Sequence, residues 1–213
     1  RSPLAVIVNY ANGLLRRLDA EREPPENLEM VLAQIRDAGE RSKEIISHVR
    51  DFVSLRQPAV QKESLQSIFQ KVQQLLQEAI NQHNIRVEMN FPPDGADVLA
   101  SRIEIEQVVF NLFKNSIDSL TSSRTESPLI RVHVHPLNDR FFEIHVRDNG
   151  PGVDGAIVDD IFKPYVTNKQ TGLGMGLSIS QTIIEGHGGR LTLVGPAQPG
   201  SCFRFTLSSF LNE

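Results

Sequence analysis

The groups best suited to bind a ligand lie in two short glycine-containing motifs. The first, Asp148-Asn149-Gly150-Pro151-Gly152, places a carboxylate before a sharp turn at the end of an expected strand. Glycine lets the backbone lie close to a flat ligand. A lone carboxylate accepts a hydrogen bond from an exocyclic amine, which adenine has at a ring position where guanine lacks one. Taken alone, the motif is also typical of a hairpin turn.

The second motif, Gly172-Leu173-Gly174-Met175-Gly176-Leu177, directly precedes an apolar helical pattern. Glycine amides at the start of a helix can cradle phosphate oxygens. A glycine triplet by itself is more often only a flexible loop. However, the ordered set of strand, carboxylate turn, polar loop and glycine-rich helix start is uncommon. Together the two motifs therefore predict an adenine nucleotide site.

An asparagine pair in an apolar helix, expected from about Arg102 to Thr121, is the third candidate group. Asn111 and Asn115 are four residues apart and share one helix face, and Lys114 and Asp118 have the same spacing. Asparagine is a poor helix former, whereas its side-chain oxygen suits Mg²⁺. Capping or a buried hydrogen bond is the alternative, but a pair beside a nucleotide site favours metal ligation.

The polar stretch before the second motif, from Phe162 to Met175, is expected to form a mobile lid over the ligand. Lys169 lies in this stretch, and Lys114 lies on the asparagine-containing helix. Each lysine either brings positive charge to phosphate groups or is a solvated surface residue, and the sequence favours neither reading.

Residues 58–213 alternate helical and strand patterns in an order that predicts an α+β sandwich, one sheet with helices on one face. We predict helices at about 65–82, 102–121 and 177–186, and strands at about 61–64, 85–89, 97–99, 130–134, 142–147, 190–194 and 202–207.

Residues 1–57 carry two amphipathic helical patterns separated by a proline-containing break. The apolar positions are Leu4, Ile7, Ala11, Leu14 and Leu18, and then Leu28, Val31, Ile35, Ala38, Ile45, Val49 and Phe52. They predict an antiparallel helical hairpin. Because a hairpin alone cannot bury two apolar faces, we predict a homodimer through a four-helix bundle; packing on the downstream domain is the alternative. Pro58 ends the second pattern, so the domain boundary is placed after residue 57.

Composition excludes several classes of function. The net charge is −4 and no basic cluster occurs, so nucleic acid is not an expected partner. No apolar run reaches the ~18 residues that span a bilayer, so we expect no membrane contact and a cytoplasmic location, while an anchor in the parent protein stays open. Cys202 is the single cysteine, which excludes an internal disulfide, and no Cys/His spacing is typical of a metal site.

Taken together, the motifs resemble the sensor histidine kinases of two-component systems, whose catalytic domain belongs to the ATPase superfamily of gyrase, the Hsp90 chaperones and MutL. The resemblance covers essentially the whole chain. The asparagine box corresponds to residues 111–118, the first glycine box to 148–152, the phenylalanine box to 162–167, with Tyr165 where phenylalanine is frequent, and the second glycine box to 172–177. The first helix resembles the subgroup that includes oxygen-sensing and tetrathionate-sensing kinases.

The resemblance implies that ATP and Mg²⁺ are bound, with Asn115 as the metal ligand and Asp148 at the adenine amine. The implied ATP-binding residues are Asn111, Lys114, Asn115, Asp118, Asp148, Gly150, Gly152, Phe162, Thr167, Lys169, Gly172, Leu173, Gly174, Met175, Gly176 and Leu177. It also implies a response regulator receiver domain as the partner that takes the phosphoryl group.

Arg1-Ser2-Pro3-Leu4 resembles the tail of the phosphoacceptor box, which implies an acceptor histidine three residues ahead of Arg1. We therefore expect this chain to be a fragment that lacks its own acceptor. The histidines within it are expected to be ordinary structural residues without an acid partner: His48, His83, His133, His135, His145 and His187.

Two other functions remain as alternatives. An ATP-hydrolysing switch of the same superfamily needs a carboxylate near the asparagine pair, but Glu104 and Glu106 lie about two turns earlier on the helix. A dimeric module that reports nucleotide without chemistry is the third possibility, and an acceptor histidine in the parent sequence would distinguish it from the kinase.

Overall fold

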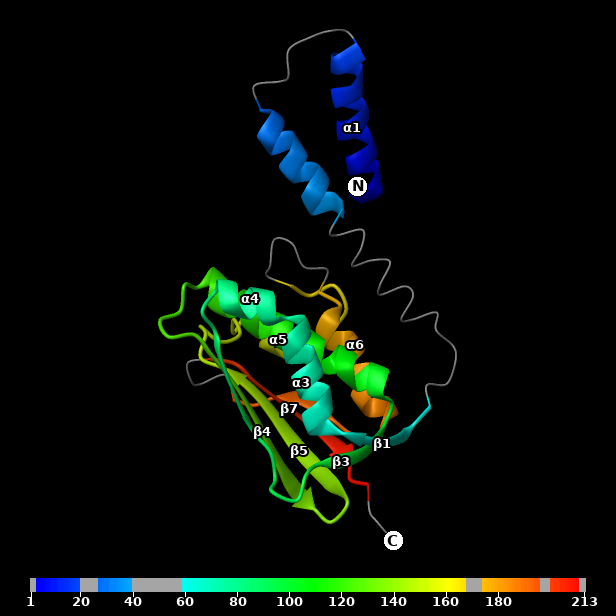
Figure 1. The fold of residues 1–213 in the computed structure, drawn as a ribbon, viewed down its shortest axis with the longest axis vertical. Coiled ribbons are helices and arrows are strands. Elements are labelled where there is room, and N and C mark those ends of the chain that lie inside the picture. Colours follow the sequence, from blue (N-terminus) through cyan, green and yellow to red (C-terminus); the bar gives the residue numbers. More distant parts are fainter. Residues whose placement is uncertain (1–2, 20–26, 40–58, 168–173, 196–199, 211–213) are drawn as a thin grey trace. The chain divides into compact units, whose positions relative to one another are not determined.

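The computed structural model describes residues 3–19, 27–39, 59–167, 174–195 and 200–210 (Figure 1). These residues form two compact units, one before and one after residues 40–58 in the sequence. The predicted domain boundary after residue 57 lies outside the described residues and stays a prediction.

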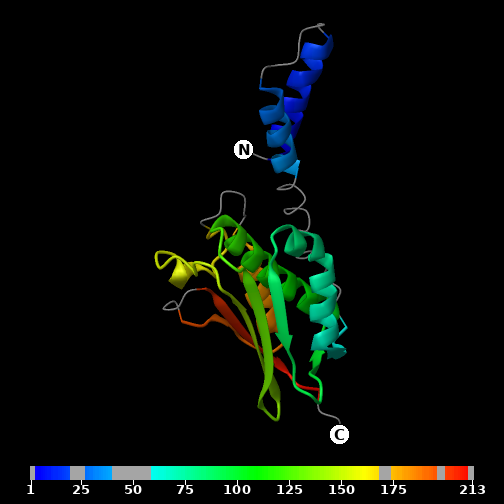
Figure 2. The ribbon, with the colours of Figure 1, turned by 60° about the vertical axis from the view of Figure 1, so that its left-hand side comes forward.

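The N-terminal unit is a pair of helices that lie side by side and run in opposite directions (Figures 1 and 2). The first is α1 (Pro3–Asp19), and the second covers residues 28–39. Half-buried positions of the predicted stripe are Ile7, Ala11, Leu14, Leu28, Val31 and Ile35. Ala38 is buried. The predicted hairpin is thereby confirmed over its described part, and Ile45, Val49 and Phe52 lie outside that part.

The C-terminal unit is built on a five-stranded sheet in the order β2-β4-β5-β7-β6. The strands are β2 (Arg86–Asn90), β4 (Leu129–Asn138), β5 (Phe141–Asp148), β6 (Leu191–Leu193) and β7 (Cys202–Ser208). β2 runs parallel to β4, and every other neighbouring pair is antiparallel. The expectation of one sheet is corrected, because β1 (Gln61–Ser64) and β3 (Asp97–Ala100) pair with each other in a separate two-stranded sheet.

Helices cover one face of the large sheet (Figure 2). They are α3 (Leu65–Leu75), α4 (Gln77–Gln82), α5 (Arg102–Ser122) and α6 (Gly176–Gly186). The single helix predicted at 65–82 is wrong, since Leu76 leaves helical geometry at φ −100° and ψ 5° and divides it into α3 and α4. Apolar periodicity runs through that break and gave no sign of it. The predicted α+β class is confirmed.

The core lies between these helices and the inner face of the sheet. The fully buried side of α5 carries Ile105, Val108, Val109, Leu112 and Phe113. It meets alternate residues of the central strands, such as Val132 on β4 and Ile144 on β5. Because side chains alternate along a strand, the residues between them project from the opposite face of the sheet. α5 therefore packs on the strand that ends in Asp148, which brings the asparagine box toward the first glycine box.

Among the described residues, no helix has the length and apolar character needed to cross a membrane.

Candidate functional site

The carboxylate of Asp148 is buried at the end of β5, with 2% of the residue exposed. Its Oδ1 accepts hydrogen bonds from the backbone amides of Gly150 at 2.9 Å and Ser201 at 3.2 Å. Its Oδ2 accepts from the hydroxyl of Ser116 at 3.3 Å and from the hydroxyl of Ser201. Four donors thus fix the carboxylate in one orientation, which is what recognition of a single amine requires.

The turn after Asp148 depends on a glycine. A Cβ atom on Gly150 would lie 2.8 Å from Ser119 Oγ and 3.0 Å from Asp148 Oδ1, both closer than ordinary van der Waals contact. A side chain at this position would therefore require Ser119 or the carboxylate of Asp148 to shift. Ser116, Ser119 and Ser201 were not predicted as site residues, because a serine gives no local signal that it will contact a carboxylate elsewhere in the fold.

The two asparagines of the pair have different surroundings. Asn111 donates from Nδ2 to the carbonyl oxygen of Gly176 at 3.2 Å and to Ser180 Oγ at 3.3 Å. Its amide nitrogen therefore ties α5 to the first turn of α6. Asn115 is half-buried one turn later, directly before Ser116. The predicted ATP contact of Asn111 stays a prediction, while Asn115 lies next to the residue that contacts Asp148.

The other polar pair of the asparagine box is an exposed ion pair. Lys114 Nζ lies 3.8 Å from Asp118 Oδ1, with 48% and 35% of the two side chains exposed. An exposed pair at this spacing is worth less than about 0.5 kcal/mol. Because this ion pair is weak, Lys114 can exchange its contact with Asp118 for a contact with a phosphate group.

The phenylalanine box and the second glycine box are joined through Gly174. This residue has φ +67°, and a Cβ on it would lie 2.6 Å from the carbonyl oxygen of Val166. The amide of Tyr165 donates to the carbonyl oxygen of Gly174 at 3.1 Å. Phe162 anchors the same loop, because its ring packs edge-on against Phe203 of β7 at 6.5 Å. The start of α6 is therefore held by the loop that precedes it.

The predicted lid is described only in part. Lys169, Gly172 and Leu173 lie outside the described residues, so their roles stay predictions. Thr167 is exposed, and Met175 and Leu177 are half-buried at the start of α6. Gly152 has φ +86°, as expected for the turn of the first glycine box.

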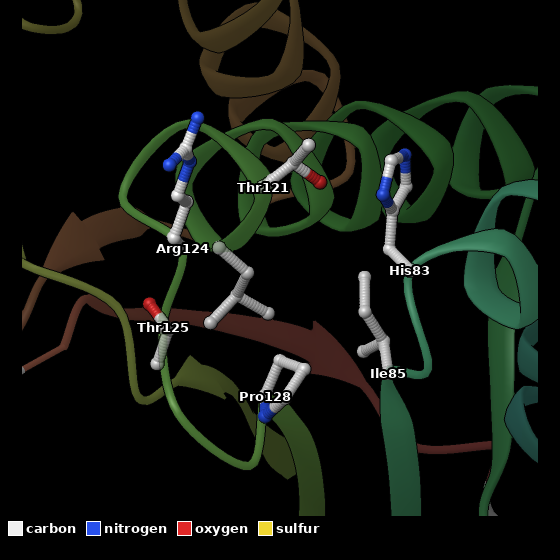
Figure 3. Close-up of a pocket in the computed structure, with 7 residues that line it drawn as sticks. His83, Ile85, Thr121, Arg124, Thr125 and Pro128 are labelled. Atoms are coloured by element: carbon white, nitrogen blue, oxygen red, sulfur yellow. The ribbon is translucent and has the colours of Figure 1, made fainter.

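A surface hollow of about 300 Å³ lies at the C-terminal end of α5 (Figure 3). It is lined by His83, Ile85, Leu120, Thr121, Arg124, Thr125 and Pro128. It contains none of the predicted nucleotide-binding residues. The candidate site is instead the surface around α5, where Ser116 meets Asp148 on one side and Asn111 meets Gly176 on the other.

Comparison with protein families gives a match to residues 100–209, described as histidine kinase-, DNA gyrase B-, and HSP90-like ATPase. The chain belongs to this ATPase family. The match includes the asparagine box, both glycine boxes and the phenylalanine box, so the resemblance noted from the motifs is confirmed. The family assignment makes ATP the expected nucleotide for the surface around α5.

Curated relatives place this ATPase domain among sensor proteins. The sensor protein FixL of Bradyrhizobium diazoefficiens is 34% identical over 206 residues, which cover 96% of this chain and 40% of FixL. The sensor protein TdiS of Thauera aromatica is 34% identical over 209 residues, which cover 96% of this chain and 37% of TdiS. The chain thus spans about two fifths of the length of these relatives.

The fold of the ATPase domain is also found in solved structures. The catalytic domain of histidine kinase ThkA is 28% identical, with a TM-score of 0.62 over 70% of this chain and 95% of that domain. ThkA in complex with response regulator protein TrrA matches 99% of this chain and 58% of that chain with a TM-score of 0.75. Its 24% identity shows the fold alone.

Proposed function

We propose that this chain is the kinase core of a two-component sensor histidine kinase. In this proposal residues 58–213 bind Mg-ATP, and the γ-phosphoryl group passes to a histidine and then to an aspartate of a response regulator. The observation that carries it is that the same sensor proteins match 96% of the chain, so the helix pair and the ATPase domain are covered together. An ATPase domain alone would equally support a hydrolysing switch.

Asp148 selects adenine in this proposal. A carboxylate has about four acceptor positions, and the four donors found around Asp148 match that number. The hydroxyl of Ser116, at 3.3 Å, makes the longest of these bonds. We expect the adenine amine to take its place, because a serine hydroxyl can rotate away while the backbone amides of Gly150 and Ser201 are fixed.

Asn115 is the proposed Mg²⁺ ligand. The residue lies half-buried on α5, one residue before the Ser116 that contacts Asp148. Its amide oxygen is a hard donor and fits an ion that takes its other ligands from water and phosphate. When bound, Mg²⁺ neutralises negative charge on the phosphates during transfer. Lys114 lies beside Asn115 and can add a second positive charge.

The phosphates are proposed to bind at the start of α6. Gly174 and Gly176 add no side chains of their own at the start of α6, and helix N-termini favour anions. The hydrogen bond from Asn111 to the Gly176 carbonyl oxygen holds this helix start against α5. Phosphoryl transfer depends mainly on such positioning and charge neutralisation.

The proposed kinase and the alternative switch differ in where the phosphate goes. We expect the parent protein, incubated with γ-labelled ATP, to retain label that is labile in acid and stable in alkali, as expected of phosphohistidine. Added receiver domain should then remove it. Release of inorganic phosphate as the sole product, with unlabelled protein, would instead support the hydrolysing switch.

We further propose that the helix pair forms a symmetric dimer. After the two helices pack on each other, apolar side chains remain exposed: Val8 at 54% and Leu15 at 55% on α1, and Met30 at 57% and Leu32 at 51% on its partner helix. Val8 and Leu15 are seven residues apart, which places them on one side of α1. A second copy of the pair would cover these side chains in a four-helix bundle.

Leu15→Asp should weaken or abolish this dimer, because a charge would be buried at the interface. The control is Asn9→Asp, which adds the same charge to an exposed position on another side of α1. Light scattering at tens of micromolar should give a dimer for the wild type and for Asn9→Asp, and a monomer for Leu15→Asp. Equal masses for the two variants would argue against the proposed interface.

A further inference from the structure

Four polar residues gather on the face of the large sheet that the helices leave uncovered. Register places His135 opposite Glu143 and His133 opposite His145 on the neighbouring strands β4 and β5. The residues between them, such as Val134, are buried on the helix side, so these four project the other way. The expectation that the histidines lack an acid partner is therefore wrong for His135 and His145. It is also wrong for His187, whose Nε2 lies 3.6 Å from Oε2 of Glu104.

Two histidine rings converge on one carboxylate oxygen. His135 Nε2 lies 3.3 Å and His145 Nε2 lies 2.8 Å from Oε1 of Glu143. The exposed fraction of the side chain is 38% for His135, 28% for His145 and 13% for Glu143. One ligand atom from each residue lies within 4.8 Å of the other two. The arrangement gives three metal-ligating atoms around one point, with solvent access on one side.

The spacing of these atoms suits a small divalent ion. In a tetrahedral zinc site with bonds of about 2.0–2.1 Å, neighbouring ligand atoms are roughly 3.3 Å apart. Glu143 Oε1 lies 3.3 Å from His135 Nε2 and 2.8 Å from His145 Nε2, both close to that value. The three ligand atoms lie within 4.8 Å of one another, so the side chains would have to adjust around a bound ion. Two histidines with one glutamate form a known zinc ligand set that leaves a position for water. Imidazole donors favour zinc, nickel or copper over magnesium.

The surroundings orient the three side chains. His145 Nδ1 lies 3.7 Å from Cys202 Sγ, so the far side of this ring already has a partner. Arg204 Nη1 lies 3.8 Å from the second carboxylate oxygen of Glu143, which leaves Oε1 for the histidines. Nδ1 of His135 is buried and has no hydrogen-bond partner among the described residues. The polar contact of that ring is therefore on the Nε2 side.

An ion pair between Arg204 and Glu143 does not by itself explain why two histidines face the same carboxylate. Arg204 would suffice as a counter-ion for Glu143, yet two histidines also face the same oxygen. A neutral imidazole can donate from only one nitrogen. If His135 donates from Nε2, its Nδ1 lone pair is buried without a donor. If the proton is on Nδ1, two lone pairs face each other at Glu143. A cation between Nε2 and Oε1 removes the repulsion between those lone pairs, and the Nδ1–H of His135 is then left without an acceptor among the described residues.

We propose that His135, Glu143 and His145 bind a divalent transition-metal ion of the zinc type. This site lies on the uncovered sheet face, is distinct from the proposed Mg²⁺ ligand Asn115, and does not depend on the proposed kinase activity. A bound ion would cross-link β4 to β5, the strand that ends in Asp148.

The test is titration of the untagged protein with Zn²⁺ by calorimetry, with Co²⁺ as a visible-absorption probe of tetrahedral geometry. We expect one Zn²⁺ per chain and a rise in melting temperature. His145→Ala and Glu143→Gln should each weaken Zn²⁺ binding at least tenfold, since loss of even an indirect partner of a metal costs about 10–100-fold.

His133→Ala is the matched control, because its ring lies 5.4 Å from that of His135 on the same face but has no contact with Glu143 among the described interactions. It should keep the wild-type Zn²⁺ affinity. Melting curves without metal check that each variant is folded. Absence of Zn²⁺ binding to the wild type, or unchanged affinity in both His145→Ala and Glu143→Gln, would overturn the proposal.

Discussion

Replacing Asp148 by asparagine should lower the affinity for ATP by roughly ten- to a hundredfold, the equivalent of about 1–3 kcal/mol. Asparagine keeps the shape of the side chain and one acceptor oxygen, so the turn at Gly150 can persist. Its amide group, however, presents donors where adenine also presents one. The loss of affinity should therefore be larger for ATP than for GTP, because guanine carries a carbonyl oxygen at that ring position.

Calorimetric titration of wild type and Asp148→Asn with ATP and with GTP measures this effect. Ser116→Ala is the matched control, because it removes one hydrogen-bond partner of the carboxylate and leaves the acceptor in place. We expect its ATP affinity to stay within about threefold of wild type, the equivalent of roughly 0.7 kcal/mol. Equal ATP affinity in wild type and Asp148→Asn would remove Asp148 from the adenine site.

Asn115→Ala should weaken Mg-ATP binding about tenfold or more while changing the binding of metal-free nucleotide little, because the lost contact is to the ion. Asn115→Asp should retain magnesium-dependent binding, since it keeps an oxygen donor. Titrations with magnesium and with a chelator separate the two conditions.

Asn111→Ala is the control on the same helix. Its amide holds the first turn of α6 through Gly176 and Ser180, so its loss should weaken nucleotide binding equally with and without magnesium. If Asn115→Ala also shows an equal loss in both conditions, Asn115 is a structural residue and not the metal ligand.

The sequence predicted the turn of the first glycine box, which depends on local chemistry, while the ligand contacts of the site stay predictions. Asp148 and Gly150 are two residues apart in the chain, and the turn between them could be predicted from the glycine. Ser201 could not be found this way, because it reaches Asp148 only through the pairing of β5 with β7, 53 residues later. The role of Asn111 was equally hidden, since its partner Gly176 belongs to another helix.

The cluster on the uncovered sheet face shows the same limit more clearly. Whether His135 meets Glu143 depends on the register of β4 against β5, and a slip of one residue would move a strand's side chains to the opposite face. That register includes an irregularity between Pro136 and Asn138, which residue spacing does not reveal. The helix pair, by contrast, was predicted correctly over its described part because its apolar positions repeat within each helix.

The central claim is that Mg-ATP bound around Asp148 and Asn115 phosphorylates a histidine of the phosphoacceptor box. The most direct test mixes this chain, as the ATP-binding partner, with an Asn115→Ala chain extended upstream of Arg1, and supplies γ-labelled ATP. We expect acid-labile label on the extended chain, mapped by mass spectrometry to a histidine before Arg1, and none when both partners carry Asn115→Ala. Label mapped instead to His48 or to another histidine within these 213 residues, or label that persists in the double Asn115→Ala mixture, would contradict it.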